Sequence, residues 1–209
     1  MLLLGHIGIT TGIVRACEIL VSSAGSQDIR QHDSASGFSA AGHKERLQPH
    51  RLLNSIRSRM GSIDYRLVVI GSLLPDILDK PLFLFGPGEL FPSGHAYGHT
   101  FLFNLLLLVC GSILFRYKKP WLLVISLSSC IHLVLDRIWN NPVTLWWPLL
   151  GPFAKGETAG WISDKIHVLT SNPSAYIPEI IGATVILLLG YRLLTRKNIT
   201  NFIKTGALS

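Results

Sequence analysis

The chain has 209 residues, of which 48% are hydrophobic and only 15% are charged, with a formal net charge of +7. Soluble domains carry roughly 25% charged residues, whereas here most Lys and Arg fall in short clusters separated by nearly uncharged runs of about 20 residues, the length that crosses a bilayer. This segregation excludes an ordinary soluble domain and predicts an all-α, polytopic helical membrane bundle of about four to five spans. The positive charge then needs no nucleic acid, because cytoplasmic loops and anionic lipid surfaces account for it.

The first apolar segment, residues 1–21, predicts a short and imperfect helix that contains His6 and Arg15. A signal peptide is the competing interpretation, and its cleavage would remove His6. We expect the segment to be retained, because no Lys or Arg precedes the apolar run and Arg15 interrupts it. Together with residues 67–194 it would form a single helical membrane domain.

Residues 22–66 change character. Their first half, SSAGSQDIRQHDSASGFSAAGHKE, is polar and lacks either structural period, which predicts a partly disordered insert. The second half places apolar residues on one helical face among arginines, which predicts a short basic helix on a membrane surface. The apolar members are Leu52, Leu53, Ile56 and Met60.

The second apolar run, residues 67–85, is interrupted by two prolines, the first at Pro75, with Asp76 and Asp79 between them. Proline removes a helix hydrogen bond, and broken backbone at membrane depth is tolerated only where it lines a cavity or is buried in protein. We therefore expect a kinked or re-entrant segment that presents carboxylates. The alternative is a kinked span in which Asp79 merely pairs with Lys80 near an interface.

A turn-rich loop, GPGELFPSGHAYG, precedes the third apolar run. Ser93 is a suitable N-cap residue, which predicts a helix that opens with His95 and His99 and continues to Arg116. A tight basic turn at residues 116–120 ends it.

The fourth apolar run, WLLVISLSSCIHLVLDRIW at residues 121–139, carries His132 and Asp136 four residues apart. An α-helix stacks side chains at this spacing on one face. Ionisable groups at membrane depth are costly and by default mark a functional site that faces protein or water.

The remaining residues predict a loop at 140–174, whose three tryptophans are typical of an interfacial belt, a last span at 176–194 and a cytoplasmic tail at 195–209. Lys and Arg concentrate in the insert, in the basic turn and after the last span. If all three clusters lie in the cytoplasm, successive spans cross the membrane in alternating directions and no cluster falls on the outer side. In this orientation the N-terminus faces out, and the His and Asp residues of the spans share one level toward the outer side.

These side chains have the chemistry of a metal site. Histidine nitrogen and aspartate oxygen bind zinc, manganese or non-haem iron, and helical pairs at i,i+4 can place two ligands on one ion. We expect a divalent transition metal, with zinc favoured over manganese, as one or two ions. Two-metal sites commonly activate water and hold both oxygens of a phosphoester displacement. The predicted ligands are His6, Asp76, His95, His99, His132 and Asp136.

Three motifs resemble those of the membrane-bound metal-dependent hydrolases, also described as LexA-binding, inner membrane-associated hydrolases. The motifs are GSLLPDILDKP, the GHT at Gly98–Thr100 and HLVLDRIWNNPVTLWWPLLGP. The motif order agrees over residues 1–20 and 67–153. The chain departs from the pattern in its longer 22–66 insert and at Gly94–Tyr97, where the family often has another His in an Arg-Gly context. The family pattern falls on His6, Leu74-Pro75-Asp76, His99-Thr100, His132 with Asp136, and Trp147-Pro148.

The resemblance implies an inner-membrane hydrolase. Our first hypothesis is a metal-dependent hydrolase that acts on a phosphoester or lipid-linked substrate through a metal-activated water. Asp76 would act at the metal, and Asp79 as general base or second ligand. The expected partners are membrane lipid and a small-molecule or lipid-linked substrate. The alternatives are a small proton- or ion-coupled transporter and a non-catalytic membrane partner protein.

Overall fold

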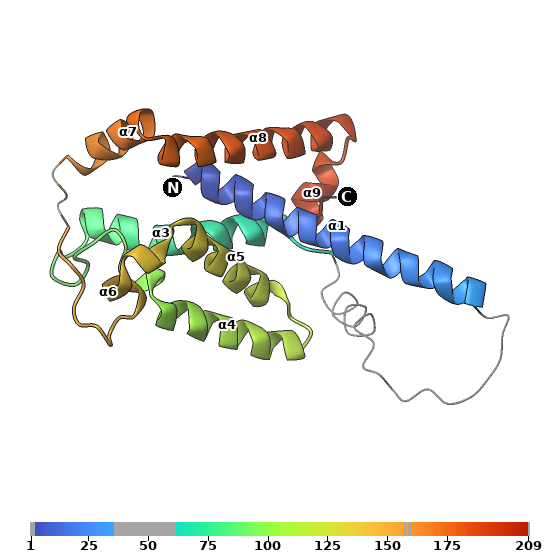
Figure 1. The fold of residues 1–209 in the computed structure, drawn as a ribbon, viewed down its shortest axis with the longest axis horizontal. Coiled ribbons are helices and arrows are strands. Elements are labelled where there is room, and N and C mark those ends of the chain that lie inside the picture. Colours follow the sequence, from blue (N-terminus) through green and yellow to red (C-terminus); the bar gives the residue numbers. More distant parts are fainter. Residues whose placement is uncertain (1–2, 36–61, 157, 159, 209) are drawn as a thin grey trace.

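The computed structural model describes residues 3–35, 62–156, 158 and 160–208. This part of the chain contains helices and no strand, which confirms the all-α class (Figure 1). The elements are α1 (Leu3–Ala35), α3 (Tyr65–Phe85), the 3₁₀ helix η1 (Tyr97–His99), α4 (Phe101–Arg116), α5 (Trp121–Leu135), the 3₁₀ helix η2 (Ile138–Asn140), α6 (Pro142–Leu145), α7 (Trp161–Ser171), α8 (Pro173–Thr195) and α9 (Ile199–Thr205).

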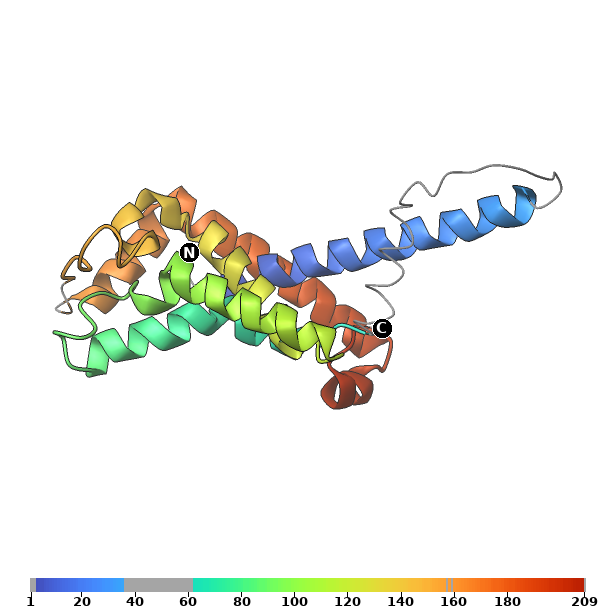
Figure 2. The same ribbon diagram turned by 90° about the horizontal axis from the view of Figure 1, so that it is seen from below.

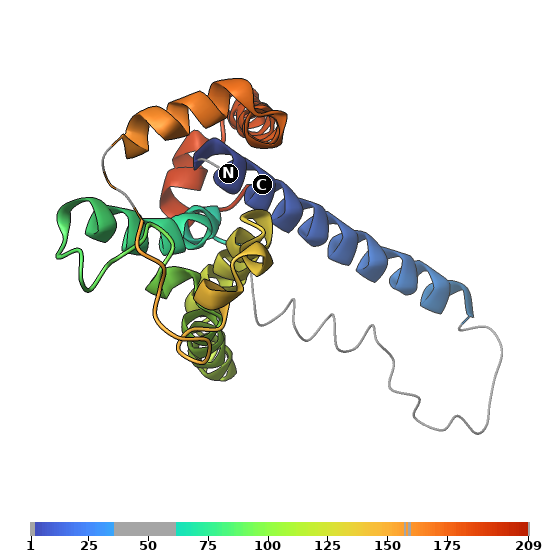
Figure 3. The same ribbon diagram turned by 60° about the vertical axis from the view of Figure 1, so that its left-hand side comes forward.

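The longer helices form a bundle in which α3 contacts both α1 and α5, while α8 packs along α1 and α4 along α5 (Figures 1 and 2). Figure 3 shows α8 on one side of α1 and α3, and the pair α4 and α5 on the other. The helices α1, α3 and α5, which carry His6, Asp76 and His132, therefore lie in the middle of the bundle.

Glycines allow the closest helix contacts. A Cβ atom on Gly8 of α1 would lie 2.0 Å from the carbonyl oxygen of Gly182 of α8, and one on Gly71 of α3 would lie 2.4 Å from the carbonyl oxygen of Ile125 of α5. Small residues let helix backbones approach in this way in membrane bundles. These contacts fix the helices that carry His6, Asp76 and His132.

The burial pattern is that of a membrane bundle. Among the described residues, 14 polar or charged side chains are buried but only eight hydrophobic ones, while large apolar side chains such as Leu187 (72% exposed) and Tyr191 (67%) face outward. Leu3–Ser23 and Pro173–Thr195 are long and apolar enough to cross a membrane, and α4 and α5 are shorter apolar helices of 16 and 15 residues. The prediction of a helical membrane bundle is confirmed.

The segment around Pro75 is one continuous helix that contains both Pro75 and Pro81. Both prolines are therefore accommodated inside the helix and do not end it. Its N-terminus is capped by Asp64, whose carboxylate accepts a hydrogen bond from the Arg66 backbone N–H at 3.0 Å.

The predicted helix from His95 to Arg116 begins later than expected, at Phe101. Thr100 is the true N-cap, because its hydroxyl accepts the backbone N–H of Phe103 at 3.1 Å. Ser93 instead closes its own turn by accepting the N–H of His95 at 3.0 Å. The fourth apolar run ends early, at Leu135, because Arg137 adopts a left-handed conformation (φ 51°) directly after the Asp136 C-cap.

Three connections contain more helix than we predicted. α1 continues to Ala35 instead of ending at residue 21, since extending an existing helix adds one hydrogen bond per residue and this segment has no proline. The expected loop at 140–174 contains α6 and α7, and the expected tail contains α9. The basic surface helix predicted around Leu52 lies outside the described residues.

The tail is anchored. α9 ends at Gly206 (φ 71°), whose carbonyl oxygen accepts the backbone N–H of Tyr65 at 2.9 Å. The Arg66 guanidinium donates to the Ile203 carbonyl oxygen at 2.8 Å. Phe202 and Leu208 pack against the buried cluster around Tyr65, so the C-terminal segment closes the bundle at the start of α3.

Candidate metal centre

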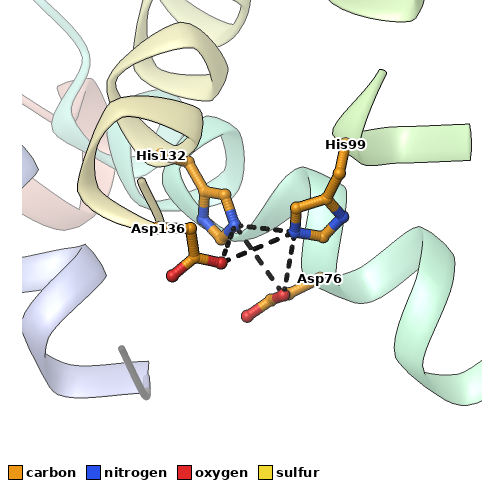
Figure 4. Close-up of side chains that lie close together, drawn as sticks. All are labelled: Asp76, His99, His132 and Asp136. Atoms are coloured by element: carbon orange, nitrogen blue, oxygen red, sulfur yellow. Dashed lines mark hydrogen bonds and ion pairs between the residues drawn. The ribbon is translucent and has the colours of Figure 1, made fainter. Parts of the chain in front are cut away.

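Four side chains from three segments of the chain meet inside the bundle (Figure 4). Asp76 comes from α3 and His99 from η1, whereas His132 and Asp136 lie one turn apart at the end of α5. Each offers one ligand atom, and these atoms all lie within 4.8 Å of one another. The structure thus brings together four of the residues that we predicted as metal ligands.

The spacing of these four atoms fits a single ion. Ligands bound to tetrahedral zinc at about 2.0–2.1 Å lie about 3.3–3.4 Å from one another. The distances in the structure scatter around that value. They are 3.2 Å between His99 Nε2 and His132 Nε2, 3.5 and 3.7 Å from Asp76 Oδ1 to Nε2 of His99 and of His132, and 3.6 and 3.4 Å from Asp136 Oδ2 to the same two atoms.

The hydrogen bonds at Nδ1 of the two imidazoles determine whether the Nε2 atom that faces the centre carries a proton. His132 Nδ1 lies 2.6 Å from the Ser72 carbonyl oxygen, which can only accept, so Nδ1 carries the proton. His99 Nδ1 lies 2.7 Å from Asp79 Oδ2 and donates likewise. In a neutral ring Nε2 is then a bare acceptor. Metal-binding histidines almost always have such a partner on the other nitrogen.

The carboxylates complete a set of converging acceptors. Asp76 Oδ1 is buried and accepts no hydrogen bond within the described part of the chain. It faces the two Nε2 atoms, as does Asp136 Oδ2. Several buried acceptors aimed at one point leave an unfavourable desolvation cost unless a cation lies between them. The donor set of two imidazoles and two carboxylates suits zinc, manganese or iron.

Asp79 does not lie in this ring of ligand atoms. It is 1% exposed, and its carboxylate accepts the backbone N–H of Ala96 at 2.8 Å and of Gly98 at 2.9 Å in addition to His99 Nδ1. The alternative in which Asp79 merely pairs with Lys80 is not observed, because Lys80 forms its ion pair with Asp76. Asp79 therefore orients His99 and fixes the loop before it.

Asn104, which we did not predict, holds the same loop together with the tight packing at Gly98. Asn104 donates from Nδ2 to the carbonyl oxygens of Gly98 and Thr100, both at 3.0 Å, and accepts the Ser129 hydroxyl at 2.6 Å. Gly98 packs so tightly that a Cβ atom would lie 2.9 Å from the backbone of Pro75. The sequence signal for Asn104 was present, since a lone amide within an uncharged apolar helix needs partners.

His6 lies on the far side of Asp136. Its Nε2 atom is 3.0 Å from Asp136 Oδ1, the oxygen that does not face the other ligands, and its ring stacks on that of His132 with centroids 4.1 Å apart. His6 therefore belongs to the cluster predicted from sequence but occupies a position behind a ligand.

His95 approaches the centre from outside the bundle. Its Nε2 atom is 3.5 Å from Asp136 Oδ2, and its ring centroid is 4.5 Å from that of His99. The two histidines do not form the expected helical i,i+4 pair, because the chain between them is a turn and η1. The His95 side chain is 36% exposed and that of Lys80 20%, so the cluster reaches the surface at these two residues, which we call the mouth of the centre.

An apolar helical bundle with a polar interior that gathers histidines and aspartates defines an integral membrane protein with a candidate metal site. The chain belongs to the YdjM inner membrane protein family, whose model matches residues 1–200. No curated protein and no solved structure matches it. The membership confirms the predicted inner-membrane character.

Proposed function

We propose that this protein is a membrane-embedded metal-dependent hydrolase that acts on a phosphoester or lipid-linked substrate. The observation that carries the proposal is that four potential ligand atoms converge on one point. In addition, each of the two imidazoles is held in place by a hydrogen bond at its other ring nitrogen. The motif order shared with membrane-bound metal-dependent hydrolases supports the choice of reaction. The ligands would be Asp76, His99, His132 and Asp136.

The spacing favours one ion over two. His6 contacts the second oxygen of Asp136 and would hold that carboxylate in position, while Asp79 and the Ser72 carbonyl oxygen would hold the two imidazoles. A bound divalent ion supplies a Lewis acid that activates water at neutral pH. Zinc or manganese fits this donor set.

The two partly exposed side chains at the mouth are placed to meet the substrate. His95 is the most exposed imidazole of the cluster, and its Nε2 atom can hold or release a proton within reach of a group bound at the centre. Lys80 contacts Asp76 and presents its ammonium group to the opening, where it would pair with a phosphate oxygen. We assign the proton transfer to His95 instead of Asp79, which is buried and whose carboxylate already accepts three hydrogen bonds.

We also infer that the metal centre faces the outer side of the membrane. The start of α3, the α4–α5 turn and the end of α8 lie at the opposite end of the bundle (Figure 1). These positions carry Arg66, the Lys118–Lys119 pair and Arg192. The positive-inside tendency places that basic end in the cytoplasm.

The experiment combines metal content with activity. Purified protein is stripped with a chelator, reloaded with zinc or manganese, and assayed on a panel of chromogenic phosphomonoesters and phosphodiesters. We expect about one ion per chain, as for a single site of this kind, and hydrolysis that returns only on reloading. His132→Ala should lose both, whereas the exposed His167→Ala control should retain both. Metal binding without hydrolysis of any substrate class, or hydrolysis that persists without metal, would contradict the proposal.

A further inference from the structure

A pocket lies at the basic end of the bundle, between α1, α8 and the C-terminal segment. Its lining combines three guanidinium groups with three leucines. The lining residues are Arg15, Leu189, Arg192, Leu193, Arg196 and Leu208.

The helices build this pocket directly. α1 and α8 run parallel, since Gly5 N–H donates to Glu179 at 3.0 Å and Gly12 faces Val185 further along. The α8 lining positions have the spacing i, i+3, i+4 and i+7, which defines one face of a helix. Arg15 comes from the turn of α1 beside that face, and Leu208 follows α9 after the chain folds back.

The charges of the pocket are not balanced. Arg15 forms an ion pair with Glu18 at 2.5 Å, and the same Glu18 oxygen also accepts the Tyr65 hydroxyl at 2.7 Å. In the part of the chain that the structure describes, neither Arg192 nor Arg196 forms a side-chain hydrogen bond or an ion pair. Like charges four residues apart on a helix repel each other. The pocket therefore holds an excess of positive charge that an anion would neutralise.

The pocket is separate from the metal centre. Glu179, near the start of α8, contacts the same turn of α1 that carries His6, and Arg192 follows roughly 20 Å further along the helix axis. Arg192 lies in the last turn of a helix that is long enough to cross a membrane. Its guanidinium group is thus placed at the level of lipid headgroups, on the side where the basic clusters gather.

We propose that this pocket binds a phosphate group, as carried by the headgroup of an anionic phospholipid. Guanidinium groups bind phosphate oxygens through paired, charge-assisted hydrogen bonds. Basic pockets between membrane helices on the cytoplasmic side suit acidic headgroups, and the three leucines offer an apolar wall to an acyl chain. Free inorganic phosphate could bind the same guanidinium groups, but it has no acyl chain to pack against the leucines. The proposal does not depend on the hydrolase assignment.

The test measures binding of phosphatidylglycerol and phosphatidylcholine with identical acyl chains to the full detergent-purified chain, by native mass spectrometry. We expect the wild type to prefer phosphatidylglycerol. The double variant Arg192→Gln/Arg196→Gln should lose about 10²-fold in affinity, because each arginine would give up a charge-assisted hydrogen bond to the bound phosphate group. The control Arg116→Gln/Lys119→Gln removes two exposed charges from the same end but not from the pocket, and should change binding by less than about 2-fold.

A second variant and a competitor keep the outcome decisive. Arg192→Lys/Arg196→Lys retains the charge without the planar fork, so it should bind with intermediate affinity and fold if the glutamine variant does not. Inorganic phosphate that binds the wild type while phosphatidylglycerol does not would support the phosphate site but overturn the lipid as its source. Equal binding of the two lipids, or equal loss in the pocket and control variants, would overturn the proposal.

Discussion

Asp79→Asn tests the positioning of His99 without touching a predicted ligand. The Asp79 carboxylate accepts three hydrogen bonds, two at Oδ2 from Ala96 N–H and His99 Nδ1–H, and one at Oδ1 from Gly98 N–H. An asparagine oxygen can replace Oδ2, but its amide group then points a donor at the Gly98 donor. The variant therefore loses the bond from Gly98 and weakens the other two, because its acceptor is neutral.

The size of the effect follows from the role of such partners. Removing the hydrogen-bond partner of a metal-binding histidine typically costs 10–100-fold in metal affinity, or about 1.4–2.7 kcal/mol. We expect Asp79→Asn to weaken zinc or manganese binding by about that factor. The assay is a competition titration against a fluorescent chelator. The thermal midpoint of the metal-free protein, measured in parallel, separates a change in the fold from a change in the site.

Asp164→Asn is the matched control. Asp164 is an exposed aspartate of α7, away from the centre. The same change of Asp to Asn there should leave the metal affinity at the wild-type value. If Asp79→Asn binds metal as tightly as wild type, or if both variants lose affinity equally, the reasoning that Asp79 orients a metal ligand is refuted.

Three further predictions concern the mouth, the packing and the cap. His95→Ala should keep about one ion per chain but lose substrate turnover by about 10²-fold or more, as expected for a proton-transfer group; unchanged turnover would remove His95 from the mechanism. Gly182→Leu should lower the thermal midpoint, because a Cβ atom there would lie 2.2 Å from the Leu4 carbonyl oxygen; a wild-type midpoint would show that α1 and α8 do not cross so closely. The hydrogen bonds from Arg66 lower the pKa of Asp64 in the folded protein. The ionised cap therefore stabilises the fold fully above the unfolded-state pKa of about 3.9. This contribution disappears as the pH falls through the lower folded-state pKa. Asp64→Asn should therefore destabilise the protein more at pH 7 than at pH 3, and an equal effect at both would contradict the assigned ion pair.

The part of the site that lies within one helix could be predicted from sequence. His132 and Asp136 follow the i,i+4 rule, and the structure places the nearest ligand atoms of the pair 3.4 Å apart. Asp76 could be predicted because a carboxylate beside Pro75 in an apolar run has few alternatives to a buried polar site. Local periodicity and the cost of burying charge were sufficient in these cases.

The rest depends on contacts between distant segments. The role of Asp79 is set by the loop at Gly98, which can approach α3 only because Gly98 lacks a side chain. The capping preference of Ser93 was reasonable locally, but Thr100 is the N-cap of α4. The tail could not be placed on α3 from sequence, since its anchor is a backbone hydrogen bond to the Gly206 carbonyl oxygen, which leaves no signature in the pattern of side chains.

The central claim is that two histidines and two aspartates of this bundle hold one metal ion. Zinc K-edge X-ray absorption of the stoichiometrically loaded protein tests it most directly. We predict a first shell of nitrogen and oxygen at about 2.0–2.1 Å with outer scattering from two imidazoles. A sulfur shell at about 2.3 Å, which would implicate Cys17, Cys110 or Cys130, or the absence of imidazole scattering would contradict the account.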